Sequence, residues 1–361
     1  ILFSWGIFQQ LYTTEIFPDH ASSVSWIGTT ALGCMYIIGG FTSIFAARIG
    51  YGKMILSGSV LVAGGLVAAS FATELGASMA NPCSLAAPPQ WFTARRGLAS
   101  GISTSGSGIG GLIFSILVEK LNDMIGYRWC LRVLGIIAWC SMMTTGLLIR
   151  QFSTTGEKPA KVSMKDMETI RRPSFLILLA GVLMTSFGYF APLNLLPSYA
   201  SDNGLSKSQG AMINSVLNAA SFFGRFAGGF FGDRFGLVNS LVFCIATSSL
   251  TTLVMWMFAK SLPVLLVYVT LYGLLGGGFI SLLPSVAAEQ FGTSSLTLLV
   301  GVIFGVNGLG SLTGTPTAIR ILDSIGEGDI TNAYKGAIGF IGGTMAVGAL
   351  TIYYLKLKLA K

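Results

Sequence analysis

The chain has 361 residues, of which 52% are hydrophobic and only 10% are charged. A soluble globular domain carries about a quarter charged residues, so the composition excludes that class and predicts an all-helical polytopic membrane protein in a lipid bilayer. The net charge of +8 does not indicate a nucleic-acid partner, because the Lys and Arg residues collect in short connections between apolar segments.

Residues 1–150 predict an N-terminal bundle of six helices, two of them incomplete. A helix needs about 20 apolar residues to span a membrane. The first apolar run ends near Tyr12 and is too short, so we expect the chain to start inside a helix; the fourth segment is also short and contains Pro82. In order, the expected segments are residues 1–12, Val24–Ala47, Met54–Thr73, Glu74–Ala87, Gly97–Val118 and Trp129–Ile149.

Residues 151–173 are a polar connection between the two halves. They combine basic residues with a few acids and show no apolar periodicity, so we expect a mobile cytosolic linker. Residues 174–361 then predict a C-terminal bundle of six complete helices: Phe175–Tyr199, Gln209–Gly232, Leu237–Phe258, Leu262–Ala288, Ser295–Ile319 and Ala333–Tyr354.

The basic residues predict the orientation of the chain. Arg48, Arg95, Arg150 and the linker bases lie on alternate connections, on the same side as the C-terminal lysines. Because Lys and Arg gather on the cytosolic side, both termini are expected in the cytosol, and the plasma membrane is the expected location. The loop after Ala288 does not follow this rule, since it carries Glu289 and no base.

The two halves contain an internal repeat, which predicts two parallel bundles of the kind found in transporters. The repeat has an offset of 200 for three glycines, Gly101, Gly108 and Gly110, which recur as Gly301, Gly308 and Gly310. Earlier in each half, Ala47–Gly50 corresponds to Asp233–Gly236 with an offset of 186. The first half therefore lacks 14 residues at the join of Glu74 and Leu75, unless the alignment is accidental. The loss would shorten the fourth helix by about 21 Å.

One helix carries a polar stripe. Asn214, Asn218, Ser221 and Arg225 are spaced along one face of the segment Gln209–Gly232. An arginine near the middle of a lipid-facing helix costs about 2.5–3.5 kcal/mol, so we expect this face to border an aqueous cavity or another helix. The alternative is that Arg225 reaches the cytosolic end of the helix and binds backbone carbonyls there.

The residues after the stripe form a short loop with an acid–base pair. Asp233, Arg234 and Gly236 resemble the loop between the second and third helices of each half in the major facilitator superfamily. The resemblance implies a gating role, in which the acid binds a neighbouring helix end and favours one access state. A plain capping role is the alternative. Ala47 replaces the acid in the first half, which argues against a latch there.

The segment Trp91–Gly101, followed by Gly106-Ser107-Gly108, resembles the fifth-helix signature of monocarboxylate-transporter-like proteins, especially their fungal branch. This resemblance extends along nearly the whole chain and implies a twelve-helix carrier of organic acids or secondary metabolites. It also implies that Arg225 binds the substrate carboxylate. The proton-coupled members have an aspartate four residues earlier, where this chain has Ser221, so proton coupling by the usual groups is not supported.

Further polar residues are weaker candidates for a site at the membrane midplane. They are Gln9 and Gln10, Tyr189 and Asn194 in the seventh segment, and Asn307 in the eleventh, and such residues often only bond helices together. Pro192 and Pro197 are expected to break the seventh segment, which is tolerated beside a cavity.

The sequence does not favour an enzyme. Residues 106–111 match a dinucleotide-binding fingerprint, but they lie within an apolar span with no preceding strand. The only histidine is His20, in a loop, and the five cysteines have no metal-ligand spacing, so no cofactor or metal is expected.

We therefore expect a secondary transporter that moves a small organic anion, a monocarboxylate or a carboxylated metabolite, by alternating access. Arg225 would anchor the anion. The alternatives are an efflux pump for a fungal secondary metabolite, a transporter-like sensor that binds without transport, and an inactive fragment. The short fourth helix would suit the sensor.

Overall fold

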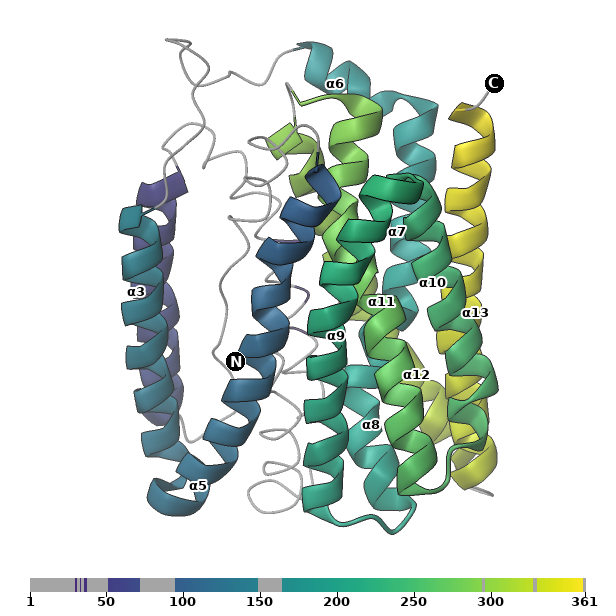
Figure 1. The fold of residues 1–361 in the computed structure, drawn as a ribbon. Helices are drawn as coiled ribbons and strands as arrows, with labels where there is room; N and C mark the ends of the chain where they lie inside the picture. The colour runs from purple at the N-terminus through teal and green to yellow at the C-terminus, as the bar shows by residue number, and fades with distance from the viewer. Residues whose placement is uncertain are drawn as a thin grey trace.

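The computed structural model describes residues 30, 33, 36–37, 51–71, 95–148, 164–293, 296–326 and 330–359. Within these ranges all regular structure is helical, as the composition predicts. Figure 1 shows the long helices side by side, with the C-terminus, α6 and the start of α5 at the same end of the bundle. We call this end the C-terminal side. The short first and fourth segments, and the join of Glu74 and Leu75, lie outside the described residues.

The N-terminal part consists of α3 (Tyr51–Phe71) and α5 (Arg96–Leu148). The label α5 covers both segments expected at Gly97–Val118 and Trp129–Ile149, as two helices that meet at a kink. The first helix continues beyond Val118 because polar residues such as Glu119 and Lys120 are good helix formers. Only Gly126 leaves the helical conformation, with φ 75° and ψ 162°. Both parts of α5 contribute to a small core against α3: Leu66, Val118, Cys130, Leu131, Leu134 and Ala138.

The linker departs from its expected irregular structure, since its last third forms the short helix α6 (Met164–Arg171). The prediction overlooked the spacing of Met164, Met167 and Ile170, which lie three residues apart as on one helical face. Ile170 packs against the main hydrophobic core, and this contact anchors α6 beside the start of α7.

The seventh segment is divided at Phe190 into α7 (Pro173–Tyr189) and α8 (Ala191–Asp202). The break expected from the prolines is therefore present, and it falls just before Pro192. Pro192 can occupy the first turn of α8 because the main-chain N–H it lacks has no intrahelical partner there. Pro197, in contrast, stays inside α8 and does not end it.

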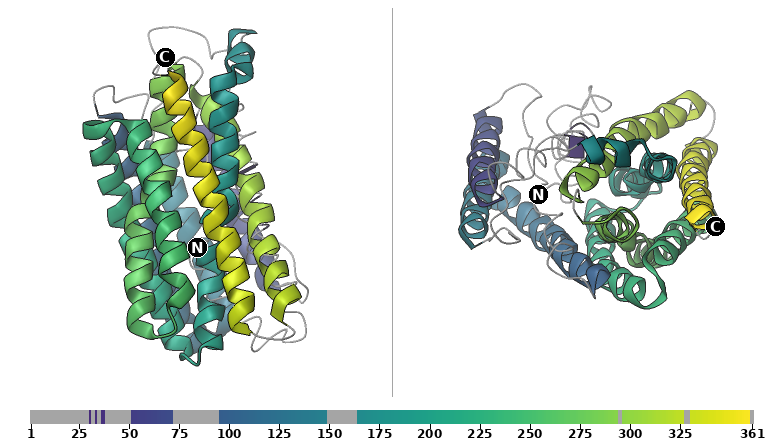
Figure 2. Two further views of the ribbon diagram at one scale, coloured as in Figure 1. Left: turned by 90° about the vertical axis from the view of Figure 1, so that its right-hand side faces the viewer. Right: turned by 90° about the horizontal axis from the view of Figure 1, so that it is seen from above.

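The remaining helices are α9 (Lys207–Phe235), α10 (Leu237–Val254), the 3₁₀ turn η4 (Trp256–Phe258), α11 (Leu262–Phe291), α12 (Leu296–Gly326) and α13 (Ile330–Leu359). They follow the expected segments closely. In the view from above in Figure 2, these helices surround a common interior. Large side chains such as Trp256, Tyr268 and Phe175 are completely buried there.

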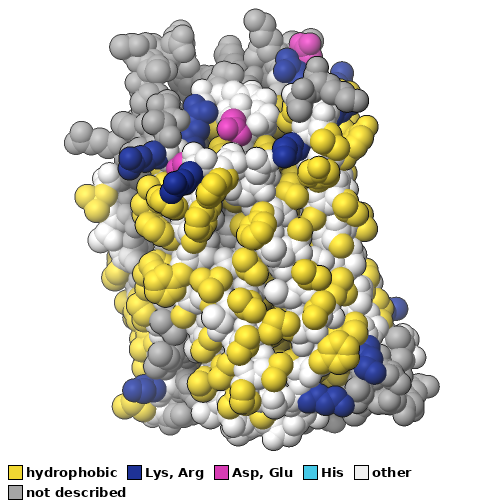
Figure 3. All heavy atoms as spheres, turned by 45° about the vertical axis from the view of Figure 1, so that its right-hand side comes forward, with side chains coloured by type: hydrophobic (Ala, Val, Ile, Leu, Met, Phe, Trp, Pro, Cys, Tyr) yellow, Lys and Arg dark blue, Asp and Glu magenta, His cyan; other side chains and the backbone are white. Residues whose placement is uncertain are grey.

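Six helical stretches in the described ranges are long and apolar enough to cross a membrane: Met124–Leu148, Pro173–Asp202, Leu237–Phe258, Leu262–Phe291, Leu296–Ser324 and Ala333–Leu359. The face in Figure 3 carries a broad band of hydrophobic side chains, with Lys and Arg toward the two ends. Exposed apolar residues such as Phe223, Leu250 and Leu350 suit contact with lipid. The chain is thus an integral, multi-pass membrane protein.

Candidate functional site

The polar stripe lies on α9 and faces the protein interior. Ser206 begins this helix with a capping box, in which its hydroxyl accepts from the Gln209 N–H and the Gln209 side chain accepts from the Ser206 N–H. Asn214, Asn218, Ser221 and Arg225 are all buried. The stripe therefore does not face lipid, where exposure of an arginine and two asparagines to hydrocarbon would be costly.

Arg225 is only 3% exposed, and two different helices bind its side chain. Its Nη1 donates a hydrogen bond of 2.7 Å to the main-chain carbonyl of Thr104 on α5. A side-chain hydrogen bond also links it to Tyr189 of α7. The alternative for Arg225 is that its side chain reaches the cytosolic end of the helix and binds backbone carbonyls there. The guanidinium does bind a backbone carbonyl, but it is buried and does not reach the aqueous phase.

A small cavity lies beside the Arg225 guanidinium. In this conformation it has room for about one water molecule. It borders four elements, α7, α8, α9 and α11, and is lined by Tyr189, Leu193, Leu217, Asn218, Ser221, Arg225, Tyr272, Gly273 and Gly277. Four residues that the sequence singled out, Tyr189, Asn218, Ser221 and Arg225, thus meet at one place.

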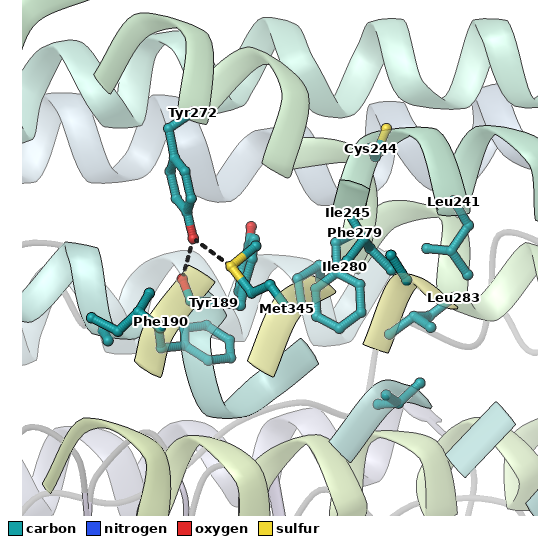
Figure 4. Close-up of a cluster of buried hydrophobic side chains, with 14 of the residues drawn as sticks. Tyr189, Phe190, Leu241, Cys244, Ile245, Tyr272, Phe279, Ile280, Leu283 and Met345 are labelled. Atoms are coloured by element: carbon teal, nitrogen blue, oxygen red, sulfur yellow. Dashed lines mark hydrogen bonds between the residues drawn. The ribbon is translucent and has the colours of Figure 1, made fainter. Parts of the chain in front are cut away.

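Aromatic rings form one wall of the cavity. The Tyr272 hydroxyl donates to the main-chain carbonyl of Tyr189 at 2.8 Å and lies 4.0 Å from the Met345 sulfur, as Figure 4 shows. The Tyr189 ring packs edge-on against Phe190 and against the tilted ring of Phe279. These contacts fix both tyrosines. No sequence pattern predicts a role for Tyr272, since this residue lies in an apolar helix and its hydroxyl bonds to a backbone atom.

Glycines bring α11 close to the polar stripe. A Cβ on Gly277 would lie 2.8 Å from the carbonyl oxygen of Ser221 and 3.0 Å from the main-chain nitrogen of Arg225. A Cβ on Gly273 would lie 2.7 Å from the Leu217 carbonyl oxygen. Because real Cβ atoms do not approach backbone so closely, these two cavity positions require glycine.

Asn214 and Asn307, the other two expected site residues, are not among the cavity-lining residues. The Asn214 carbonyl accepts a hydrogen bond of 3.0 Å from the Asn218 side chain. Asn307 is hydrogen-bonded to Ser186 of α7 and so joins α12 to α7. Asn194 is buried on α8 without lining the cavity, and Gln9 and Gln10 fall outside the described residues.

The last turn of α9 meets the start of α5 on the C-terminal side. The loop expected at Asp233, Arg234 and Gly236 is helical up to Phe235, so only Gly236 is a connecting residue. The two carboxylate oxygens of Asp233 accept hydrogen bonds of 2.8 Å from the N–H groups of Gly97 and Leu98. Arg234 is exposed beside the Phe235 ring, and Gly236 makes the turn into α10 with φ 95°. The acid thus binds a helix N-terminus in the other half of the chain, where a negative charge is favourable.

The internal repeat reappears as equivalent contacts between helices. A Cβ on Gly108 would lie 2.8 Å from the Cβ of Phe222, and a Cβ on Gly308 would lie 2.8 Å from the Cβ of Tyr36. Gly108 and Gly308 are 200 residues apart, whereas Tyr36 and Phe222 are 186 apart. The contacts therefore follow both offsets found in the sequence.

Comparisons with known proteins agree with this architecture. A sequence model of the Major Facilitator Superfamily matches residues 2–236 and, separately, residues 178–360. The chain is 28% identical to an MFS transporter of Aspergillus flavus, asaE, over 99% of this chain and 85% of the relative. It is 26% identical to the fujikurins efflux protein of Gibberella fujikuroi, over 98% of this chain and 79% of the relative.

A solved structure has the same fold. The human organic anion transporter MFSD10 superposes with a TM-score of 0.68 at 12% identity, over 97% of this chain and 89% of its own length. The helical bundle, the repeated glycine contacts and the family match lead to one conclusion. The chain belongs to the major facilitator superfamily and is a membrane transporter.

Proposed function

We propose that this transporter carries small organic anions, monocarboxylates or carboxylated metabolites, by alternating access, with Arg225 as the group that binds the carboxylate. The observation that carries the proposal is a buried arginine at the edge of a cavity. A guanidinium offers two parallel N–H donors that match a carboxylate, and removal from water strengthens the interaction. The neutral side chains of Asn218 and Ser221 would complete the polar part of the site.

The names of similar proteins support export as the direction of transport. The relative from Gibberella fujikuroi is named an efflux protein for fujikurins, and 98% of this chain aligns with 79% of that protein. We propose that this chain likewise exports an acidic secondary metabolite across the plasma membrane, with both termini in the cytosol. Membership of the monocarboxylate-transporter-like subfamily is part of the same proposal.

Two six-helix bundles, residues 1–150 and 174–361, would open alternately on the two sides of the membrane. On the C-terminal side, the bonds from Gly97 and Leu98 to Asp233 join α5 to α9 and so connect the two bundles. We propose that this contact acts as a latch for that side. The Arg225–Thr104 bond lies deeper along the same pair of helices.

Flux measurements on reconstituted vesicles test the proposed function. Purified protein in liposomes should move radiolabelled 2-naphthoate and phenylpyruvate saturably, above the passive leak of protein-free liposomes. Unlabelled carboxylate on the opposite side should accelerate the flux. Saturable binding of both probes without flux would contradict transport and favour the sensor.

A further inference from the structure

Arg225 donates from Nη1 to a main-chain carbonyl of the other half of the chain, and this is one of the donors that the proposed site would offer to a carboxylate. We propose that the carbonyl of Thr104 and the substrate compete for the Arg225 guanidinium, so that the arrangement described above is the one that releases the anion. This inference rests on the proposed role of Arg225 in carboxylate binding. It adds a positioning residue, Thr104, and an order of events.

The contact between the two residues is well defined. The Nη1–O distance is 2.7 Å, and Thr104 and Arg225 are 5% and 3% exposed. The Thr104 hydroxyl is bonded to the Ser100 carbonyl at 2.8 Å, within its own helix. A carbonyl oxygen has two lone pairs, so the Thr104 carbonyl can bond within α5 and still accept from Arg225.

Close packing keeps the two groups together in this conformation. A Cβ on Gly101 would lie 2.5 Å from the Arg225 carbonyl oxygen, and a Cβ on Gly229 would lie 2.3 Å from the Gly97 carbonyl oxygen. The helices α5 and α9 therefore approach to backbone contact on the C-terminal side, and Figure 1 shows α5 leaning away from α9 toward the opposite end. The neighbouring cavity has room for about one water, which is too little for a carboxylate-bearing ligand.

Opening on the C-terminal side would separate these helices and move Thr104 away from Arg225. The guanidinium could then give both donors to an anion. Closing would bring the carbonyl back and displace the anion toward the other side. Because a ligand favours the state that binds it better, the anion should bind more tightly to the state open on the C-terminal side. With the C-terminus in the cytosol, this difference suits uptake from the cytosol and release outside.

A distance measurement without ligand tests the contact itself. Spin labels are attached at the exposed positions Ile102 of α5 and Phe230 of α9, in a variant that lacks the native cysteines. Arg225→Ala should shift the distance distribution toward longer values, because it removes the bond to Thr104. The matched control is Ser221→Ala, which removes a cavity hydroxyl from the same stripe and should leave the distribution unchanged. An unchanged distribution in Arg225→Ala would overturn the inference, whatever its effect on transport.

A binding measurement tests the competition. Gly229→Ala places a methyl group against α5 and should favour the state in which α5 and α9 are separated. Because a larger fraction of the protein is then in the state that binds the anion, 2-naphthoate should bind about tenfold more tightly to this variant than to the wild type. Gly106→Ala is the control on α5, since a Cβ there meets nothing within 4 Å. Asp233→Asn, which weakens the latch without adding volume, should also tighten binding if Gly229→Ala does not fold.

Calorimetry on nanodiscs gives the affinities. Equal or weaker binding in the separated-helix variants would overturn the competition. If the wild type and every variant fail to bind 2-naphthoate, the proposed carboxylate site is wrong. The spin-label distances then still decide whether Arg225 holds α5 and α9 together.

Discussion

The carboxylate of Asp233, at the end of α9, accepts the N–H of Gly97, at the start of α5, at 2.8 Å. The second carboxylate oxygen accepts from Leu98 at the same distance. Two otherwise unsatisfied donors of a helix N-terminus are thereby bonded by one charge from the other half of the chain. The residue equivalent to Asp233 in the first half is Ala47, so only the second half of the repeat supplies a carboxylate at this position.

Replacement of Asp233 by Asn should shift the population toward states open on the C-terminal side. The amide keeps one acceptor but loses the charge, and hydrogen bonds to charged groups contribute about 1.5–3 kcal/mol each. Labelling of single cysteines on the two sides of the membrane measures the shift. Arg234→Gln is the control, because Arg234 is exposed at the adjacent position. Identical labelling in Asp233→Asn and wild type would leave only the capping role.

A Gly224→Ala variant should be less stable than the wild type. The added Cβ would lie 2.3 Å from the Leu274 carbonyl oxygen and 2.5 Å from that of Gly273, so α9 and α11 would have to separate. Overpacking of this kind costs about 1–3 kcal/mol. Gly339→Ala on α13 is the matched control, since its Cβ meets nothing within 4 Å and alanine favours the helix by about 1 kcal/mol. Melting temperatures in detergent should fall for the first variant and hold or rise for the second; the opposite order would contradict the close packing.

Tyr334→Phe should weaken the side of the bundle opposite the C-terminus. The Tyr334 hydroxyl donates to an Asp202 carboxylate oxygen at 2.5 Å and so joins α13 to the end of α8. Loss of a hydrogen bond to a carboxylate costs about 1.5–3 kcal/mol, with the lower value expected here because Asp202 is exposed. Thermal unfolding measures the loss, and Tyr354→Phe on the exposed face of the same helix provides the comparison. Equal melting temperatures for both variants would show that the bond does not contribute.

Apolar segments predicted most of the fold because the bilayer sets their length. Other features depended on details that hydropathy does not distinguish. A polar stretch around Glu119 reads as a connection, yet its residues are good helix formers and α5 continues through them to Gly126. A charged linker reads as irregular, yet Ile170 packs against the core and α6 forms beside it.

The candidate site was predictable where its residues share one helix. The spacing of Asn218, Ser221 and Arg225 fixes them on one face of α9, independent of the rest of the fold. Tyr272 and the Thr104 carbonyl come from other helices, and their roles depend on tertiary contacts that no local pattern encodes. Asn307 is the opposite case. Its polarity makes it a candidate site residue, but its side chain bonds to Ser186 and so joins α12 to α7.

Insertion of 14 apolar residues between Glu74 and Leu75 should increase the folded yield in membranes. The two offsets of the repeat, 186 and 200, are both matched by equivalent glycine contacts, and their difference of 14 is the length of the segment that we propose is missing from the first half. A shortened helix leaves a hydrophobic mismatch in the bilayer, which the insertion would relieve. Fluorescence-detected size-exclusion chromatography compares the yields. A second insertion of the same segment in the 151–163 linker region is the control, and equal yields from both would remove the argument for a lost segment.

Carboxylate transport by Arg225 variants tests the central claim most directly. Arg225→Lys keeps the charge but replaces a planar pair of donors by a compact ammonium that is more costly to dehydrate, so transport of 2-naphthoate should weaken. Arg225→Ala should reduce the apparent affinity on the order of ten- to a hundredfold, since a charge-assisted hydrogen bond contributes about 1.5–3 kcal/mol. Both variants must be present in the vesicles at the wild-type level. Wild-type uptake by the Arg225→Ala protein would contradict the assignment of Arg225 as the anion-binding residue.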